Sequence, residues 1–549
     1  MSATEWRWHH ACVMSLGMLL AFTQLGSATE WAKVTELHLQ QAGNRPEGSP
    51  ASDLFLLANE PGDAQAYLCM DVDLEQLSQT STPLARLRIP SLTKVPTKRP
   101  GQKVSTTRGA LHAFACLAGD PVPQLVGSTP VKPAGIPTPY VIDVTAVVND
   151  VLRRPSGQRK VRIDLRMTGL PSYYEVYAMA VSADKTPFLE VAPATGWTSD
   201  WEQRLEPLCA GPLVYHEACM PMTADRNMEA IPPLLYPVKR IIEVVHNGTG
   251  EKLKEGRDWL LRDGKLVLPP GTRAPVQVEK EFFARQPKPG EPAVTNARPQ
   301  SIILLEGTWY HERQMEVSYE PASRDWEMPV QPASLDRLPR LQRLLAAKAP
   351  VRLILFGDSI SLGGNASKFE GAWPFQPNFG ELVARQLERR TGSRITFMNH
   401  SRGGAGAAYG AGQAQSQAGW FKPDLVLIGF GMNDRSPERQ KTFKTDMEKI
   451  IDTIRAASPE TEFVVITPMF NNPKQPDKGE AILVIREEIL KIRRPGLIFA
   501  DVTSVEQALL KHKNYLDFSG NGANHPNDFI HRIYAQCILD VLASPGKEK

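Results

Sequence analysis

Short apolar runs recur in the C-terminal part of the chain, and each gives way to glycine and polar residues. The strand-like segments that contain them lie at 353–356, 394–399 and 424–430. Each is typical of a buried strand, and their order is the one that a doubly wound sheet presents. Leucines with helical spacing follow Ser334, which predicts a capped helix leading into the first strand. We therefore predict a three-layer α/β domain with a mostly parallel sheet over 334–549.

The N-terminal part shows a different pattern, in which proline, glycine and serine divide short strand-like runs. These runs lie at 66–72, 84–89, 140–148 and 161–167. Regularly spaced short strands with turn residues between them are typical of antiparallel sheets. The pattern predicts a β-sandwich over 29–200.

The middle of the chain is also rich in strand-like runs. They lie at 240–245, 265–268 and 277–279, separated by Gly-Thr-Gly and Pro-Pro-Gly turns. A second β-rich domain is predicted over 201–333. Its segment 285–300 is rich in proline and charge, as a surface loop or linker would be.

The first 28 residues have the pattern of an export signal. Arg7 precedes an apolar stretch over 11–25, and the small residues Gly26 and Ala28 follow. The stretch is too short and too often interrupted for a membrane span, which needs about 20 apolar residues; the alternative is a short buried helix. We expect a bacterial protein exported to the periplasm or beyond, without a membrane span in the mature chain.

The charge balance and the cysteines limit which classes of partner and cofactor are expected. The 63 basic and 60 acidic residues nearly balance, and no polybasic run appears, so nothing suggests nucleic acid as a partner. Six cysteines include Cys12 in the export signal, and the pairs Cys209 with Cys219 and Cys69 with Cys116 are candidates for bridges whose connectivity stays open. No spacing suits zinc or haem, so we expect no metal and no cofactor.

The candidate chemistry begins where the first strand ends. Gly357-Asp358-Ser359 follows the apolar run, which places a serine hydroxyl at the carboxyl end of a parallel strand, where ligands gather. Ser359 is therefore a candidate nucleophile; the alternative is a serine that only caps a helix. Three later blocks favour the nucleophile over the helix cap. They are Asn399 to Gly404, Gly431-Met-Asn433-Asp434, and Asn524-His525-Pro526.

With these four blocks, residues of roughly 350 to 545 resemble the SGNH (GDSL-type) hydrolase family, whose blocks centre on Ser, Gly, Asn and His. Ser359 matches the nucleophile, Gly404 the glycine of the second block, Asn433 the asparagine of the third and His525 the histidine of the last. The resemblance implies a serine hydrolase and says little about the substrate.

The residue types fit that chemistry. A serine hydroxyl needs a base to take its proton at neutral pH, and histidine suits this task. His525 fills that role. For the oxyanion of the tetrahedral intermediate we assign the backbone N–H of Ser359, the backbone N–H of Gly404 and the side-chain amide of Asn433.

The last block departs from the family's Asp-x-x-His, because Gly522 stands at the position of the aspartate that would orient the imidazole. Asn521, one residue earlier, is the favoured substitute. Asp528 and Asp517 are alternatives, and so is a dyad oriented by a backbone carbonyl.

Aromatic residues near the blocks bear on the substrate. Trp373, Tyr409 and Trp420 are expected in loops that overhang the site, where flat faces with polar edges suit sugar rings; ordinary packing is the alternative. The run 142–145 loosely resembles the DNRLRE type of sandwich domain, which is found attached to secreted carbohydrate-active proteins. We expect a secreted serine esterase that removes short acyl groups, foremost acetyl, from an acylated carbohydrate. A lipase or thioesterase and an inactive carbohydrate-binding protein are the alternatives.

Overall fold

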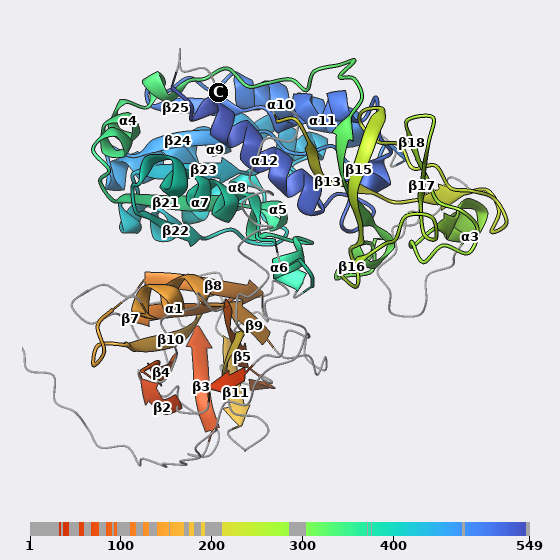
Figure 1. Cartoon of the computed structure of the whole chain (residues 1–549). Helices are drawn as coiled ribbons and strands as arrows, with labels where there is room; N and C mark the ends of the chain where they lie inside the picture. The colour runs from red at the N-terminus through yellow and green to blue at the C-terminus, as the bar shows by residue number, and fades with distance from the viewer. Residues whose placement is uncertain are drawn as a thin grey trace, which may run out of the picture. The chain divides into compact units, whose positions relative to one another are not determined.

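The chain divides into two compact units, Met1–Thr198 and Ser199–Lys549 (Figure 1). In the second unit the structure, a computed structural model, describes residues 211–284 and 304–544 except 371, 375 and 475–477. In the first unit it describes 32–34, 37–42, 54–59, 67–75, 84–89, 93–95, 110–116, 124–130, 140–152, 154–168, 175–180 and 188–192. The expected export signal and most of the expected linker 285–300 lie outside these residues. The expected boundary between 333 and 334 falls within the second unit.

The described residues of the first unit form antiparallel strands in three sheets. The largest has the order β2-β4-β10-β7-β8, with bounds Leu37–Ala42, Tyr67–Asp73, Lys160–Thr168, Ala110–Cys116 and Gln124–Pro130. The second is β1-β12-β5-β9, with bounds Ala32–Val34, Phe188–Ala192, Leu84–Ile89 and Tyr140–Asp143. The third is β3-β11-β6, with bounds Leu54–Asn59, Glu175–Ala180 and Thr93–Val95.

The buried side chains described in this unit come from the first two sheets and from one helix. Met70 and Ile163 lie opposite each other in the β4–β10 ladder, and both are fully buried. Helix α1, Thr145–Leu152, adds Val148 and Val151 to the buried set. The alternation of buried residues along the strands is what one covered sheet face requires. The β-sandwich and the DNRLRE resemblance stay predictions.

The second unit begins with a β-rich part. Its main sheet is antiparallel, with the order β13-β20-β15-β16 and bounds Val214–Cys219, Met315–Pro321, Val238–His246 and Glu251–Lys252. Two small pairs complete it: β14 (Met222–Thr223) with β19 (Gln277–Val278), and β17 (Leu260–Arg262) with β18 (Lys265–Val267). Helix α3, Glu279–Ala284, follows β19.

The rest of the second unit carries the predicted parallel sheet. Its five strands have the order β22-β21-β23-β24-β25, and every neighbouring pair is parallel. The bounds are Ile395–Asn399, Val351–Gly357, Leu425–Gly429, Glu462–Ile466 and Leu497–Ala500. The prediction of a mostly parallel α/β sheet is confirmed. All carboxyl ends therefore meet at one edge, which is the edge where this topology places a site.

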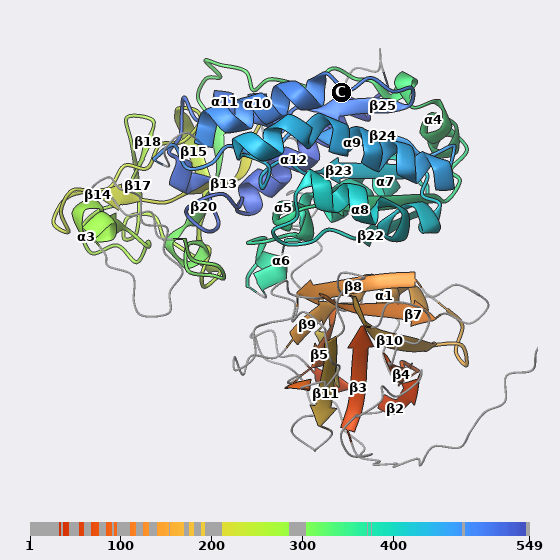
Figure 2. The same cartoon turned by 180° about the vertical axis from the view of Figure 1, so that it is seen from behind.

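Helices cover both faces of this sheet, as Figures 1 and 2 show. Ile354 and Phe356 of β21 point to the face where α8, α9 and α10 pack, whereas Leu355 points to α7 on the other face. The helices are α4 Pro339–Ala346, α5 Ser359–Leu362, α6 Ser367–Glu370, α7 Phe379–Thr391, α8 Ala407–Gln417, α9 Pro437–Ala457, α10 Lys478–Leu490, α11 Val502–Leu509 and α12 Asp528–Val541.

The predicted helix start at Ser334 is wrong. A short 3₁₀ turn, Leu335–Arg337, comes first, and α4 begins only at Pro339. Proline at the first helical position is favoured because its fixed φ suits the helix and its missing N–H would be unpaired there. The Ser334 hydroxyl donates to the carbonyl of Pro332 instead of capping a helix.

A buried ion pair joins the two parts of the second unit. Lys513 Nζ lies 2.6 Å from Glu217 Oε1 of β13, and neither side chain is exposed. The hydroxyl of Tyr319 donates to the other oxygen of Glu217 at 2.7 Å. Asp517 accepts the backbone N–H of Met220 at 2.7 Å. These contacts hold the β-rich part firmly against the sheet edge that carries the four blocks.

Two further predictions can be compared with the structure. Cys219 is a free, buried thiol, so the candidate bridge between Cys209 and Cys219 is not present. Pairing of Cys69 with Cys116 stays a prediction. Among the described residues, no helix combines the length and the apolar character that crossing a bilayer requires.

Candidate active site

The serine block forms a tight turn between β21 and α5. Ser359 is the first residue of α5, and Asp358 caps the helix by accepting the N–H of Ile360 at 3.0 Å. Gly357 has no room for a side chain, because a Cβ there would lie 2.3 Å from the carbonyl oxygen of Gly429. The close approach of β21 and β23 therefore fixes the position of Ser359, whose side chain is half-buried.

The structure brings Ser359 and His525 together. Nε2 of His525 lies 2.8 Å from Oγ of Ser359. His525 comes from the loop before α12, where its carbonyl accepts the N–H of Gly520 and Asn527 caps the helix through the N–H of Ile530. A serine hydroxyl and an imidazole nitrogen at this distance can exchange a proton.

Two residues contact the other imidazole nitrogen. Nδ1 of His525 lies 2.8 Å from Oδ1 of Asn365 and 3.2 Å from Oε2 of Glu306. Asn365 is buried in the loop after α5, with φ of 64°, a conformation that asparagine tolerates better than most residues. Burial raises the pKa of Glu306, but the hydrogen bond and charge of His525 outweigh it, and the pKa ends below its ordinary value.

Sequence reasoning missed Glu306 altogether. It belongs to the β-rich part and precedes β20, so no pattern near the histidine block could point to it. Asn365 carried a weak signal, because an asparagine in the loop that follows the nucleophile can reach the site.

The favoured orienting residue, Asn521, contacts the backbone of the histidine loop and Glu306 instead of the imidazole ring. Its Oδ1 accepts the backbone N–H groups of Ala523, Asn524 and His525 at 2.9 to 3.0 Å. Its Nδ2 donates to Oε1 of Glu306 at 3.3 Å. Asn521 therefore shapes the histidine loop and contacts Glu306, and the contact with Nδ1 comes from other residues.

The two alternative carboxylates, Asp528 and Asp517, bind backbone N–H groups of other segments. Asp528 is buried and accepts the N–H of Ser367 at 2.8 Å. Asp517 accepts the N–H groups of Met220 and Asn514, and burial raises its pKa to about 6. Neither side chain has a hydrogen bond to His525 among the described residues.

The predicted oxyanion donors lie in the expected segments. Gly404 is exposed, with φ of 74° and open space where a Cβ would stand. Within the described part of the chain, the backbone N–H groups of Ser359 and Gly404 have no hydrogen-bond acceptor. Asn433 donates one N–H of its amide to the carbonyl of Ala405 at 2.9 Å, and this leaves the second for a ligand.

Of the three aromatic candidates, Trp420 does not reach the site. It precedes β23, and the carbonyl of its neighbour Phe421 accepts from Arg352 at the amino end of β21. Ser359 follows the carboxyl end of that strand, about 20 Å away at the rise of a β-strand. Trp420 therefore lies at the opposite edge of the sheet.

Of the other two aromatic residues, Trp373 lies in the turn between α6 and α7, as expected, whereas Tyr409 lies on a helix. Tyr409 sits in the first turn of α8, packs against the core and lies under the guanidinium of Arg402. Trp373 packs against the turn at Gly250, and His311 contacts its carbonyl oxygen.

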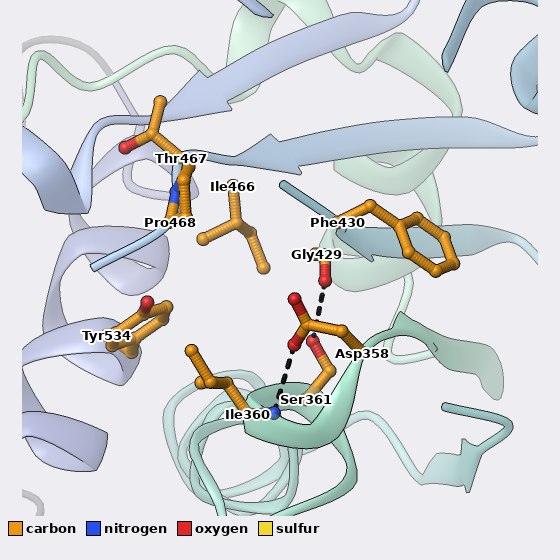
Figure 3. Close-up of a pocket in the computed structure, with 9 residues that line it drawn as sticks. All are labelled: Asp358, Ile360, Ser361, Gly429, Phe430, Ile466, Thr467, Pro468 and Tyr534. Carbon is orange, nitrogen blue, oxygen red and sulfur yellow. Dashed lines mark hydrogen bonds between the residues drawn. The ribbon is translucent and has the colours of Figure 1, made fainter. Parts of the chain in front are cut away.

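A small cavity is lined by residues that flank the nucleophile in the sequence (Figure 3). It is lined by Asp358, Ile360, Ser361, Gly429, Phe430, Ile466, Thr467, Pro468 and Tyr534. Ser359 and His525 are not part of the lining, so this cavity is not the place where a substrate meets the nucleophile. Burial raises the pKa of Asp358 to about 7. Among the described residues, no group of three or more His, Cys, Asp or Glu side chains is placed to hold a metal ion.

Residues 355–533 match the model of the GDSL-like Lipase/Acylhydrolase family. No curated protein matches the chain.

Solved structures similar to part of the chain include three hydrolases. LAE5, an alpha/beta hydrolase enzyme from the metagenome of Lake Arreo, is 20% identical with a TM-score of 0.30, over 35% of this chain and 95% of its own. Axe2, an acetylxylan esterase from Geobacillus stearothermophilus, is 17% identical with a TM-score of 0.30, over 36% and 96%. A two-domain esterase (CEX) active on acetylated mannans is 17% identical with a TM-score of 0.32, over 40% and 58%. On the family match, residues 355–533 belong to the GDSL-like lipase/acylhydrolase family and form a carboxylic ester hydrolase domain.

Proposed function

We propose that the protein is an exported serine esterase that removes short acyl groups, foremost acetyl, from carbohydrate esters. The observation that carries the proposal is the 2.8 Å contact between Oγ of Ser359 and Nε2 of His525. A base in contact with the hydroxyl is what converts a poor nucleophile into an effective one at neutral pH.

In the proposed reaction, Oγ of Ser359 attacks the ester carbonyl carbon while its proton passes to Nε2 of His525. The oxyanion is bound by the backbone N–H groups of Ser359 and Gly404 and by the amide of Asn433. Collapse breaks the bond to the sugar oxygen, which takes the proton from Nε2 of His525 and departs as the free hydroxyl, and leaves an acyl-serine. Water, activated by the same imidazole, then releases the acid and restores the enzyme.

The surface of the described residues favours a short acyl group. A lipase or thioesterase needs an extended apolar groove that leads to the nucleophile. The exposed large apolar residues in the described part are Met228, Ile231, Ile242, Val330, Phe369, Trp420 and Val484. They come from separate elements, and Trp420 lies at the far edge of the sheet. Phe369 alone belongs to the segment that follows the serine block.

The carbohydrate part of the proposal rests on the polar surroundings of the site. Glu306 and Gly404 are exposed beside the histidine and serine blocks, as groups that contact a sugar would be. The small net charge of +3 suits a neutral substrate. An inactive carbohydrate-binding protein is the less favoured alternative, because the contact between Ser359 and His525 is intact.

The test compares chain lengths and natural esters. Protein without residues 1–28 should hydrolyse 4-nitrophenyl acetate with a higher kcat/KM than 4-nitrophenyl octanoate, and should release acetate from an acetylated plant or algal polysaccharide. Ser359→Ala measures the background. A preference for octanoyl esters or acyl thioesters, with no acetate from any glycan, would contradict the substrate assignment. Export has its own test, because N-terminal sequencing of the secreted protein should begin near residue 29.

A further inference from the structure

We propose that Glu306 is the acidic positioning residue of His525, in place of the carboxylate that the family carries at the position of Gly522. The inference rests on the proposed serine mechanism. Glu306 lies outside the matched residues 355–533, in a segment that the β-rich part contributes. The hydrolase domain would then depend on its neighbour for one member of the catalytic machinery.

The proton positions follow from the reaction. Nε2 of His525 must accept the proton of Ser359, so Nδ1 must carry a hydrogen before the reaction and donate it to an acceptor. The two acceptors are Oδ1 of Asn365 and Oε2 of Glu306. Both fix the tautomer and the ring orientation.

The two acceptors differ in charge. When the imidazolium forms, a neutral amide adds only a hydrogen bond, whereas a carboxylate adds attraction between opposite charges. The lowered pKa of Glu306 keeps it ionised at neutral pH, although burial by itself would raise that pKa. Asn365 therefore chiefly orients the imidazole ring, whereas Glu306 also stabilises the positive charge that the ring gains during the reaction.

The segment around Glu306 is bound to both sides of the site. The N–H of Leu305 donates to the carbonyl of Asn521 at 3.2 Å. Asn521 Nδ2 donates to the carboxylate itself at 3.3 Å. On the other side, Asn365 Nδ2 donates to the carbonyl of Gly307 at 3.1 Å. Glu306 is thus held between the histidine loop and the loop that follows the nucleophile.

The same segment closes the place where the family's aspartate would stand. Tyr310 is buried, and its hydroxyl oxygen would lie 2.0 Å from a Cβ on Gly522. Gly522 has φ of 80°, which also disfavours a side chain there. One segment of the β-rich part therefore supplies both Glu306 and the tyrosine that excludes a side chain at position 522.

Solvent limits the size of the effect. The side chain of Glu306 is 51% exposed, whereas that of His525 is 10% exposed. Water and salt screen such a carboxylate more than a buried one. Loss of the charge should cost about tenfold to a hundredfold in kcat, less than the roughly ten-thousandfold that a buried triad aspartate can give.

The decisive variants are Glu306→Gln, which removes the charge and keeps the size, and Glu306→Asp, which keeps the charge. Glu327→Gln is the matched control, because Glu327 is an exposed carboxylate whose neighbour Trp326 stacks on Tyr236 and His512, outside the histidine loop. Glu306→Gln should lower kcat as stated, and should move the acid limb of the pH profile of kcat/KM to lower pH, by about half a unit or more. Glu306→Asp should lie between the wild type and Glu306→Gln in both respects.

Two results would overturn the inference. One is a Glu306→Gln variant with the kcat and pH profile of Glu327→Gln while Ser359→Ala is inactive. The other is a lowered kcat with an unmoved acid limb, which a purely structural role would give. Activity that survives in Ser359→Ala would instead contradict the proposed function, so the two failures are distinct.

Discussion

The hydroxyl oxygen of Tyr310 lies where a side chain at position 522 would have to begin: a Cβ built on Gly522 would be 2.0 Å from it. Tyr310 belongs to the β-rich part, and Gly522 belongs to the histidine loop. This contact shows how closely the β-rich part enters the edge of the parallel sheet. It also accounts for the glycine at a position that the family fills with aspartate.

Gly522→Ala should therefore destabilise the protein through two effects. A non-glycine residue at positive φ costs about 1 to 3 kcal/mol, and the clash with Tyr310 adds to this cost. Gly256→Ala is the matched control, because Gly256 has φ of 78° and open space around it. Urea unfolding should show a larger loss for Gly522→Ala than for Gly256→Ala. Equal losses would mean that Tyr310 yields without cost.

Asn433→Ala should lower kcat by about a hundredfold or more, because one donor to the oxyanion is lost. The hydrogen bond from Asn433 to the carbonyl of Ala405 is lost as well, so the unfolding midpoint should fall slightly. Measuring kcat and the urea midpoint together separates the two effects. A fall in stability with kcat unchanged would assign Asn433 to loop structure alone.

Asn521→Ala should lower both stability and kcat, since three backbone N–H groups lose their acceptor and Glu306 loses a donor. The loss of stability should be about 1 to 3 kcal/mol. Asp517→Asn and Asp528→Asn should leave the pH profile of kcat/KM unchanged, because both carboxylates bind backbone groups away from the imidazole. A shifted profile in either variant would move the orienting role to that carboxylate.

Glu506→Gln should change how stability depends on pH. Burial raises the pKa of Glu506 from 4.5 to about 8, and its Oε1 has no hydrogen-bond partner in the described part of the chain. The folded protein therefore holds a proton that the unfolded chain releases, so this group lowers stability as pH rises from about 4.5 to 8. The slope for one proton is about 1.4 kcal/mol per pH unit. In urea unfolding at pH 5, 6, 7 and 8, the free energy of unfolding of Glu506→Gln should rise relative to that of the wild type toward pH 8. A constant difference between the two proteins would contradict the assignment.

Much of the site could be predicted because the parallel sheet brings residues that follow its strands together at one edge. Ser359 and Asn433 follow neighbouring strands, and a local run of apolar residues marks each strand. Carboxyl ends of parallel strands meet at one edge, so order along the sequence translates into closeness in space. His525 follows no strand of the sheet, because α11 and a 3₁₀ turn separate it from β25, so its sequence block alone predicted it.

What could not be predicted depends on contacts between distant segments. Glu306 reaches His525 only because the β-rich part packs against the sheet edge, and no local pattern encodes that packing. Trp420 was misplaced because α8 and the turn after it return the chain to the amino edge before β23 begins. Ser334 was misread as a cap because proline at 339 sets the start of α4.

The most direct test of the account is whether Ser359 is the nucleophile. The protein should be treated with an alkyl fluorophosphonate, and the modified residue and the remaining esterase activity should be measured by mass spectrometry and by 4-nitrophenyl acetate hydrolysis. The account predicts a single adduct on Ser359 and activity lost in proportion, with much slower labelling of His525→Ala. Full activity with Ser359 modified, or an adduct on another residue that alone tracks the loss of activity, would contradict it.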